Sequence, residues 1–172
     1  ANPLFGTTAT QAAALYATLG AEKSLAFFKA LRTRGVRVVD GNSVVRDMVV
    51  RGELAFGLTD TDDAASAIEK KAPVKIVAPD QDQGGTLIVP STVGLLAGAP
   101  HPAQGRAMVD YLLSASTEGA LLRAGACQTS VRTEGAPPVE SAFASIKAMN
   151  VSLQDVQAKL PQALDELREV FM

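Results

Sequence analysis

Residues 54–63 read LAFGLTDTDD, an apolar run followed at once by a polar cluster. A short continuous apolar run bounded by turn residues is typical of a buried strand in a parallel sheet. Residues 64–70, which follow, have the composition of a helix. Because open α/β sheets bind ligands at the carboxyl ends of their strands, we expect residues 59–63 to lie at such an end. They are the first candidate for a binding site.

The composition is that of a globular chain. Its 172 residues are 47% hydrophobic, enough for the core of one domain or slightly more. Sixteen basic against 18 acidic residues, with no basic stripe among aromatic residues, argue against a nucleic-acid partner. No apolar run reaches the ~20 residues of a membrane helix, and no secretory signal opens the chain, so we expect a mature, truncated or cytosolic form. The single cysteine, Cys127, excludes an internal disulfide and is expected to be a small core residue.

Helical and strand-like segments alternate along the chain, which predicts an α/β fold with a mainly parallel sheet. The expected strands are residues 36–39, 54–58, 74–78 and 86–89. Apolar residues at helical spacing predict a helical hairpin before Gly35, a helix from Pro102 to Leu113 and a shorter one at residues 118–124. The loop 79–85 has the composition of a turn or hinge.

Capping residues set the other helix boundaries. Thr8 or Thr10 is expected to cap the first helix and Asn42 or Ser43 the third. Gly20 and Gly52 are expected to end these two helices.

The last helical region is predicted to open at a capping box and to pack into the core. Ser152 and Asp155 form the box, and Pro161 is expected to break or kink the helix. An apolar stripe at helical spacing runs along it, made of Leu160, Leu164, Leu167 and Phe171.

Three polar clusters fall at predicted helix starts. They are Thr7, Thr8 and Thr10 at the first helix, Asn42 and Ser43 at the third, and Thr59, Asp60, Thr61, Asp62 and Asp63 at the fourth. Helix starts offer unpaired N–H groups and the positive end of a dipole, so several that converge can cradle an anion or a polar solute. One such cluster alone is more often a cap than a ligand contact. Because the pattern recurs at three strand ends, it favours a binding cleft.

An ordered series of segments resembles the bacterial extracellular solute-binding proteins of the ferric-binding type, which are receptors of ABC importers. The resemblance covers essentially the whole chain. It rests on Gly6 through Thr10, the turn Gly41, Asn42 and Ser43, the pair Gly52 and Glu53, the segment Ala99, Pro100, His101 and Pro102, and the helix with Asp110, Tyr111, Leu112, Leu113 and Ser114.

The resemblance implies a periplasmic-binding-protein fold of type II, in which two lobes trap the solute by closing. Each lobe would be a three-layer αβα unit with a mixed, mainly parallel sheet. Residues 1–88 and 127–172 would form the second, ligand-binding lobe, and residues 89–126 would belong to a first lobe whose opening portion is absent. The contacts of similar proteins map onto Thr7, Thr8, Ala9, Asn42 and Ser43. Five further candidates come from the helix starts: Thr10, Thr59, Asp60, Thr61 and Asp62.

The chain departs from its ferric-binding relatives at the metal ligands. Those proteins place two adjacent tyrosines where this chain has Thr61 and Asp62, so ferric iron is a doubtful solute. Asp60, Asp62 and Asp63 could bind a divalent metal, but aspartates also favour a helix start, and we prefer that interpretation. His101 is interpreted as a capping or solvent-facing residue. We predict no metal site and no cofactor.

The leading hypothesis is a non-catalytic, substrate-binding component of an ABC transporter. It would capture a polar or anionic small solute or a metal ion and deliver it to permease subunits from the periplasm, the cell exterior or a surface anchor. One alternative is the effector-sensing domain of a transcription regulator. Another is a magnesium-dependent phosphate enzyme, against which stands the lack of a P-loop, of a nucleophile beside a histidine and of a dinucleotide fingerprint. An exposed edge at residues 86–96 predicts dimerisation or domain swapping.

Overall fold

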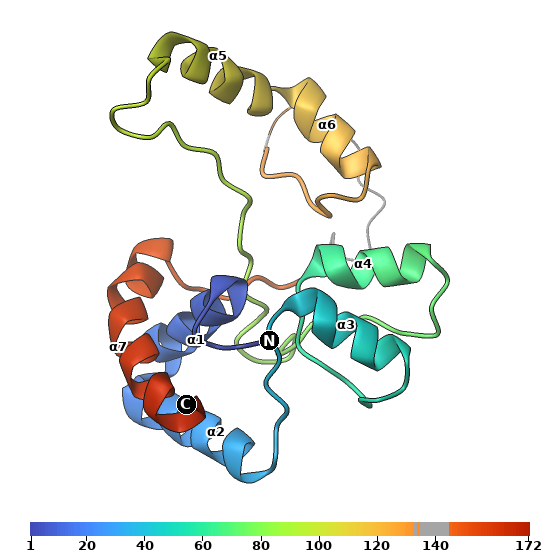
Figure 1. Ribbon diagram of the computed structural model, residues 1–172, viewed down its shortest axis with the longest axis vertical. Helices are drawn as coiled ribbons and strands as arrows, with labels where there is room; N and C mark the ends of the chain where they lie inside the picture. The colour runs from blue at the N-terminus through green and yellow to red at the C-terminus, as the bar shows by residue number, and fades with distance from the viewer. Residues whose placement is uncertain (133, 135–144) are drawn as a thin grey trace. The chain divides into compact units, whose positions relative to one another are not determined.

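The computed structural model describes residues 1–132, 134 and 145–172, and these contain seven helices (Figure 1). The helices are α1 (Gly6–Leu19), α2 (Ala21–Thr33), α3 (Asn42–Val50), α4 (Thr61–Glu69), α5 (Pro102–Leu112), α6 (Ala115–Arg123) and α7 (Leu153–Phe171). The chain forms two compact units. Unit 1 comprises Ala1–Ile88 and Lys147–Met172, and unit 2 comprises Val89–Ile146.

The predicted three-layer αβα fold with a mixed sheet is wrong. The described residues form helices and irregular segments, and their β pairing is limited to an isolated parallel bridge between Thr86 and Ala148. A strand needs a neighbour that pairs its backbone groups and covers its side chains, and an apolar run does not reveal whether that neighbour exists. Phe56 and Val77, taken as strand residues, are 84% and 75% exposed.

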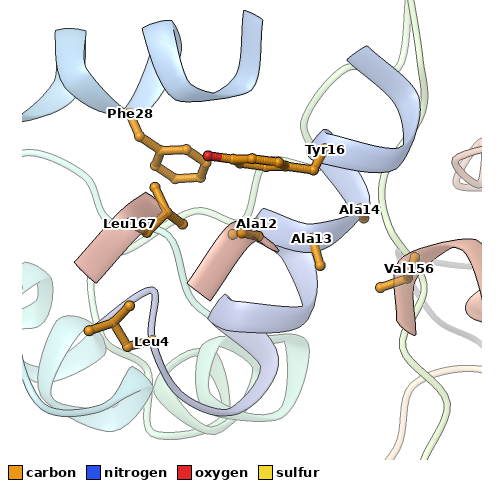
Figure 2. Close-up of a cluster of buried hydrophobic side chains, with 9 residues drawn as sticks. Leu4, Ala12, Ala13, Ala14, Tyr16, Phe28, Val156 and Leu167 are labelled. Carbon is orange, nitrogen blue, oxygen red and sulfur yellow. The ribbon is translucent and has the colours of Figure 1, made fainter. Parts of the chain in front are cut away.

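The core of unit 1 is formed by α1, α2 and α7. Ala12, Ala13 and Ala14 are buried on α1, and their small side chains let α7 lie close against it. Figure 2 shows Tyr16 of α1, Phe28 of α2 and Leu167 of α7 in the same cluster, with Leu4 and Val156. The predicted hairpin of α1 and α2 is confirmed.

The prediction for the last helix is confirmed at its start and along its stripe. The Asp155 N–H donates to Ser152 Oγ at 3.0 Å, and Leu167 is fully buried. Leu160, Leu164 and Phe171 pack against the core. Of the expected break or kink at Pro161, the break does not occur, because α7 continues through this residue. A proline removes one backbone hydrogen bond, and the packing on both sides of Pro161 holds the helix together.

The glycines end their helices as predicted, but the predicted N-caps are wrong. Gly20 and Gly52 have positive φ angles of 82° and 72°, which glycine adopts without steric cost. Helix α1 begins at Gly6 and α3 at Asn42, and neither start has a side-chain cap. The hydroxyl of Thr10 instead donates to the Gly6 carbonyl at 3.2 Å.

Unit 2 contains α5 and α6. Pro102 is the first residue of α5, as predicted, but no residue of α5 is buried. Its expected apolar face is therefore open to solvent, and Tyr111 is 64% exposed. Helix α6 begins at Ala115, earlier than predicted, because Ser114 caps it by accepting the Thr117 N–H. None of the described helices is both long and apolar enough to cross a membrane.

Polar contacts of Glu118 tie the segment after α6 to that helix. The carboxylate accepts the Val131 N–H at 3.0 Å and the Ser130 hydroxyl at 2.9 Å, and Arg132 Nε lies 2.8 Å from it. The Val131 N–H is the main reason why the pKa of Glu118 lies below its usual value. Cys127 is half-buried, and burial raises the pKa of its thiol. The composition of residues 129–138 predicts a loop; residues 129–132 and 134 are irregular as expected, and the rest of that stretch lies outside the described residues.

Candidate functional site

Polar side chains from the starts of α1, α3 and α4 meet in unit 1. Asn42 Nδ2 donates to Thr7 Oγ1 at 2.9 Å and to Asp60 Oδ2 at 2.5 Å. Thr7 Oγ1 also lies 3.3 Å from Asp60 Oδ2, to which it donates. We name Thr7, Asn42 and Asp60 the helix-start cluster. Its members come from three segments that are distant in sequence, so the cluster exists only in the folded chain.

The packing of α3 beside α4 positions two of these residues. Val45 and Met48 of α3 and Ala67 of α4 are buried, and the two helices are in contact (Figure 1). The Thr59 hydroxyl donates to the Asn42 carbonyl at 3.2 Å, which fixes the approach to α4 against the start of α3.

An arginine that sequence reasoning missed joins the same two helices. Arg46 lies 2.6 Å from Asp63 and 2.8 Å from Asp47. Because Arg46 follows Asn42 by one helical turn, it lies on the same face of α3. This spacing was visible in the sequence, but a single arginine on an amphipathic helix usually faces solvent.

The two aspartates that share Arg46 have opposite pKa shifts. Burial is the main reason why the pKa of Asp63 is raised; the charges of Asp60 and Asp62 add to the shift, and Arg46 opposes it. The hydrogen bond from Arg46 is the main reason why the pKa of Asp47 is lowered. The same hydrogen bond raises the pKa of Arg46.

A small cavity of about 110 Å³ lies beside the cluster, at the starts of α1 and α3. It is lined by Ala1, Asn2, Phe5, Gly6, Thr7, Thr8, Asp40, Gly41 and Asn42. A cavity needs only about 10–15 Å³ in this measure to hold one water molecule, so the space is large enough for a compact group of a few heavy atoms. The first N–H groups of a helix have no partner within it, so the two starts are suited to a negatively charged group.

The other predicted site residues lie in varied surroundings. Thr8 lines the cavity, Ala9 is buried, and Thr59 reaches the cluster only through the Asn42 carbonyl. Ser43, Thr61 and Asp62 are exposed, and no hydrogen bond among the described residues joins their side chains to the cluster. Thr10 is bound to its own helix.

The acidic residues do not gather into a metal centre in the part of the chain that the structure describes. No group of three or more histidine, cysteine, aspartate or glutamate residues there has an arrangement that could hold a metal ion. Asp60 stands at the N-cap position of α4, and Asp62 and Asp63 lie in its first turn, where the helix dipole favours carboxylates.

Residues 1–126 match the family model described as bacterial extracellular solute-binding protein. The chain belongs to this family. A curated relative from Salmonella typhi, provisionally named a 2-aminoethylphosphonate-binding periplasmic protein, is 27% identical over 158 residues. The match covers 90% of this solute-binding chain and 45% of the relative, so the chain spans less than half of that protein's length. No solved structure matches the chain.

The family confirms the resemblance inferred from Gly6 through Thr10, the Asn42 turn and the later segments. It also supports the role of binding a solute outside the cytoplasm over that of an enzyme. The specific likeness to iron carriers finds no support, since neither the family description nor the relative's name concerns iron.

Proposed function

We propose that this chain is part of the substrate-binding component of an ABC transporter and that it captures a small zwitterionic phosphonate. The coarser role, solute binding, follows from the family. In the proposed arrangement, residues 1–88 and 127–172 form the ligand-binding lobe and residues 89–126 belong to the other lobe. The protein works in the periplasm or outside the cell and delivers its solute to permease subunits.

The helix-start cluster carries this proposal. Two helix starts beside a small cavity favour a negative group, but Asp60, which is hydrogen-bonded to Asn42 of the cavity lining, adds a carboxylate next to it. Asp60 Oδ2 accepts from Asn42 and Thr7, while Asp60 Oδ1 is buried without a hydrogen-bond partner among the described residues. A bare anion would be repelled by this carboxylate. A solute with an anionic group and an ammonium group could be bound by the helix starts and by Asp60 together.

The relative's provisional name supports this class of solute. 2-Aminoethylphosphonate carries a phosphonate and an ammonium group two carbons apart, and it is the compound in the name of the Salmonella typhi protein. Such a solute would contact both lobes only in the closed form. It would therefore bind the closed form more tightly than the open form and shift the population toward closure.

A thermal-shift comparison of the full-length gene product with matched solutes tests the proposal. Binding to the native state raises its melting temperature by mass action. 2-Aminoethylphosphonate should give a larger shift than ethylphosphonate, which lacks the amine, and than ethanolamine, which lacks the phosphonate. Phosphate, sulfate, ferric iron and divalent cations complete the panel.

Two variants and a control assign the effect to the site. Asn42→Ala should abolish the shift, and Asp60→Asn should remove the preference for 2-aminoethylphosphonate over ethylphosphonate. Asp82→Asn, a substitution of the same kind at an exposed residue in a loop, should behave like the wild type. Equal shifts with ethylphosphonate and 2-aminoethylphosphonate in the wild type would contradict the role of Asp60, and no shift with any member of the panel would contradict the solute class.

A further inference from the structure

The chain leaves unit 1 after Ile88 and returns to it at Lys147, and these two crossings are joined side by side within unit 1. Thr86 and Ala148 form the isolated parallel bridge. The Thr86 N–H donates to the Lys147 carbonyl at 2.9 Å, and the Met149 N–H donates to the Thr86 carbonyl at 2.8 Å. The outgoing and the returning segments are therefore hydrogen-bonded to each other within unit 1, next to the points where the chain leaves and re-enters it.

The side chain of Gln81 extends this pairing. Its Oε1 accepts the Lys147 N–H at 2.8 Å, and its Nε2 lies 3.2 Å from the Lys147 carbonyl oxygen, to which it donates. The Gln81 amide thus bonds both backbone groups of Lys147, as the backbone of another strand residue would. Nε2 also donates to Thr86 Oγ1 at 2.9 Å, and that hydroxyl donates to the Pro79 carbonyl at 2.7 Å. We name Gln81, Thr86 and Lys147 the crossing clasp.

The loop that carries Gln81 is shaped to reach the returning segment. Gly85 is buried with φ of +85°, and a Cβ atom built on it would lie 2.6 Å from the Ala148 carbonyl oxygen. Its N–H donates to the Asp80 carbonyl at 2.8 Å, which closes the turn. The Lys147 ammonium donates to the Gln83 carbonyl of the same loop. Only glycine at position 85 permits this close backbone approach.

We infer that Gln81 is a positioning residue for the motion between the two units, and this inference rests on the proposed solute capture by closure. With the clasp intact, the two crossing segments rotate together about one axis. The backbone dihedral angles that change on closure are then those on the unit 2 side of the clasp, in residues 87–90 and at Ile146. Without the amide, a bridge between single residues holds the crossings, and each can rotate separately. The open form then samples more arrangements, so closing it around a solute costs more conformational entropy.

The test measures the distance between the units in the full-length gene product, with Cys127→Ser as background. Spin labels on Glu22→Cys in α2 and Gln104→Cys in α5, both exposed positions, report the distance distribution by double electron–electron resonance. Gln81→Leu should broaden the distribution without solute and weaken 2-aminoethylphosphonate binding by roughly tenfold, or about 1.4 kcal/mol. Gln83→Leu is the matched control, since its side chain makes no hydrogen bond among the described residues, and it should match the wild type.

The two readouts separate this inference from the proposed function. A distribution in Gln81→Leu as narrow as in the wild type would overturn the role of Gln81, whether or not a solute binds. A broadened distribution in a protein that binds no member of the solute panel would support the clasp and contradict the proposed function. Gln81→Glu keeps the acceptor for the Lys147 N–H and loses the donors, so a width between those of the wild type and Gln81→Leu is expected.

Discussion

The hydroxyl of Tyr16 in α1 donates a 2.9 Å hydrogen bond to Glu166 in α7. Tyr16 is 1% exposed, and Gln162 binds the second oxygen of the same carboxylate at 2.9 Å. Burial is the main reason why the pKa of Tyr16 is raised, and the hydrogen bond to Glu166 adds to it. This pair joins the two helices within unit 1.

Tyr16→Phe should lower the free energy of unfolding by about 1 kcal/mol, the typical value of one hydrogen bond. The folded protein holds the tyrosine proton more tightly than the unfolded chain, so this contribution is complete below about pH 10 and falls as the pH rises further. Urea unfolding at several pH values checks both points. Tyr111→Phe removes the other tyrosine hydroxyl, on exposed α5, and should leave the stability unchanged; an equal loss in both variants would contradict the assignment.

The helix-start cluster should behave as a coupled unit. Thr7→Val keeps the shape and removes the hydroxyl, while Asn42→Ala removes the donor that both Thr7 and Asp60 accept. A double-mutant cycle measured by chemical unfolding should give a coupling energy of about 0.5–3 kcal/mol. The control is a second cycle that combines Thr8→Val with Asn42→Ala. Its coupling energy should be near zero, because Thr8 has no hydrogen bond to Asn42. Additive effects of Thr7→Val and Asn42→Ala would show that the cluster is not coupled.

Asp63→Asn and Asp47→Asn should change stability with pH in opposite directions. The raised pKa of Asp63 means that the folded state disfavours its charge, so its contribution to stability falls as the pH rises through the carboxylate range. The lowered pKa of Asp47 means that the folded state favours its charge, so its contribution to stability rises as the pH rises through the same range. The free energy of unfolding of Asp63→Asn, taken relative to the wild type, should therefore be higher at pH 7 than at pH 3. For Asp47→Asn the same difference should be lower at pH 7 than at pH 3. Unfolding curves at the two pH values check this, and parallel changes in the two variants would contradict it.

Gly85→Ala should destabilise unit 1, and Gly84→Ala should not. The added Cβ at position 85 meets the Ala148 carbonyl and requires a left-handed backbone, which alone costs about 1–2 kcal/mol. Position 84 has open space and no positive φ. Thermal unfolding of both variants measures the difference; similar melting temperatures would mean that the loop at residues 79–85 can move away from the returning segment.

Local features were predictable from the sequence, and features that depend on distant partners were not. Ser152 with Asp155, and Gly20 and Gly52, set helix ends through contacts within a few residues, so their patterns were sufficient. The expected strand at residues 54–58 failed because a strand is completed by a neighbour elsewhere in the chain. The predicted N-caps failed because Thr10 bonds the carbonyl of its own helix, while Asn42 is the first residue of α3 and its side chain bonds Thr7 and Asp60.

The candidate site shows the same limit. Polar residues at helix starts were visible as three clusters, but only folding determines which side chain of each cluster meets the others. Ser43 and Thr61 have the same chemistry as Thr7 and remain exposed. The assignment of Asp60 to a ligand group stays a prediction until a solute is bound.

The close packing of α1 against α7 also sets an order of events when the chain is made. Tyr16 and Glu166 are 150 residues apart, so α1 leaves the ribosome long before its partner helix is synthesised. Its alanine-rich face has little apolar surface with which to hold itself on other segments, and contacts of high sequence separation form slowly. Helix α1 should therefore be among the last elements of unit 1 to become stable, and until then it is a natural target for chaperones and proteases.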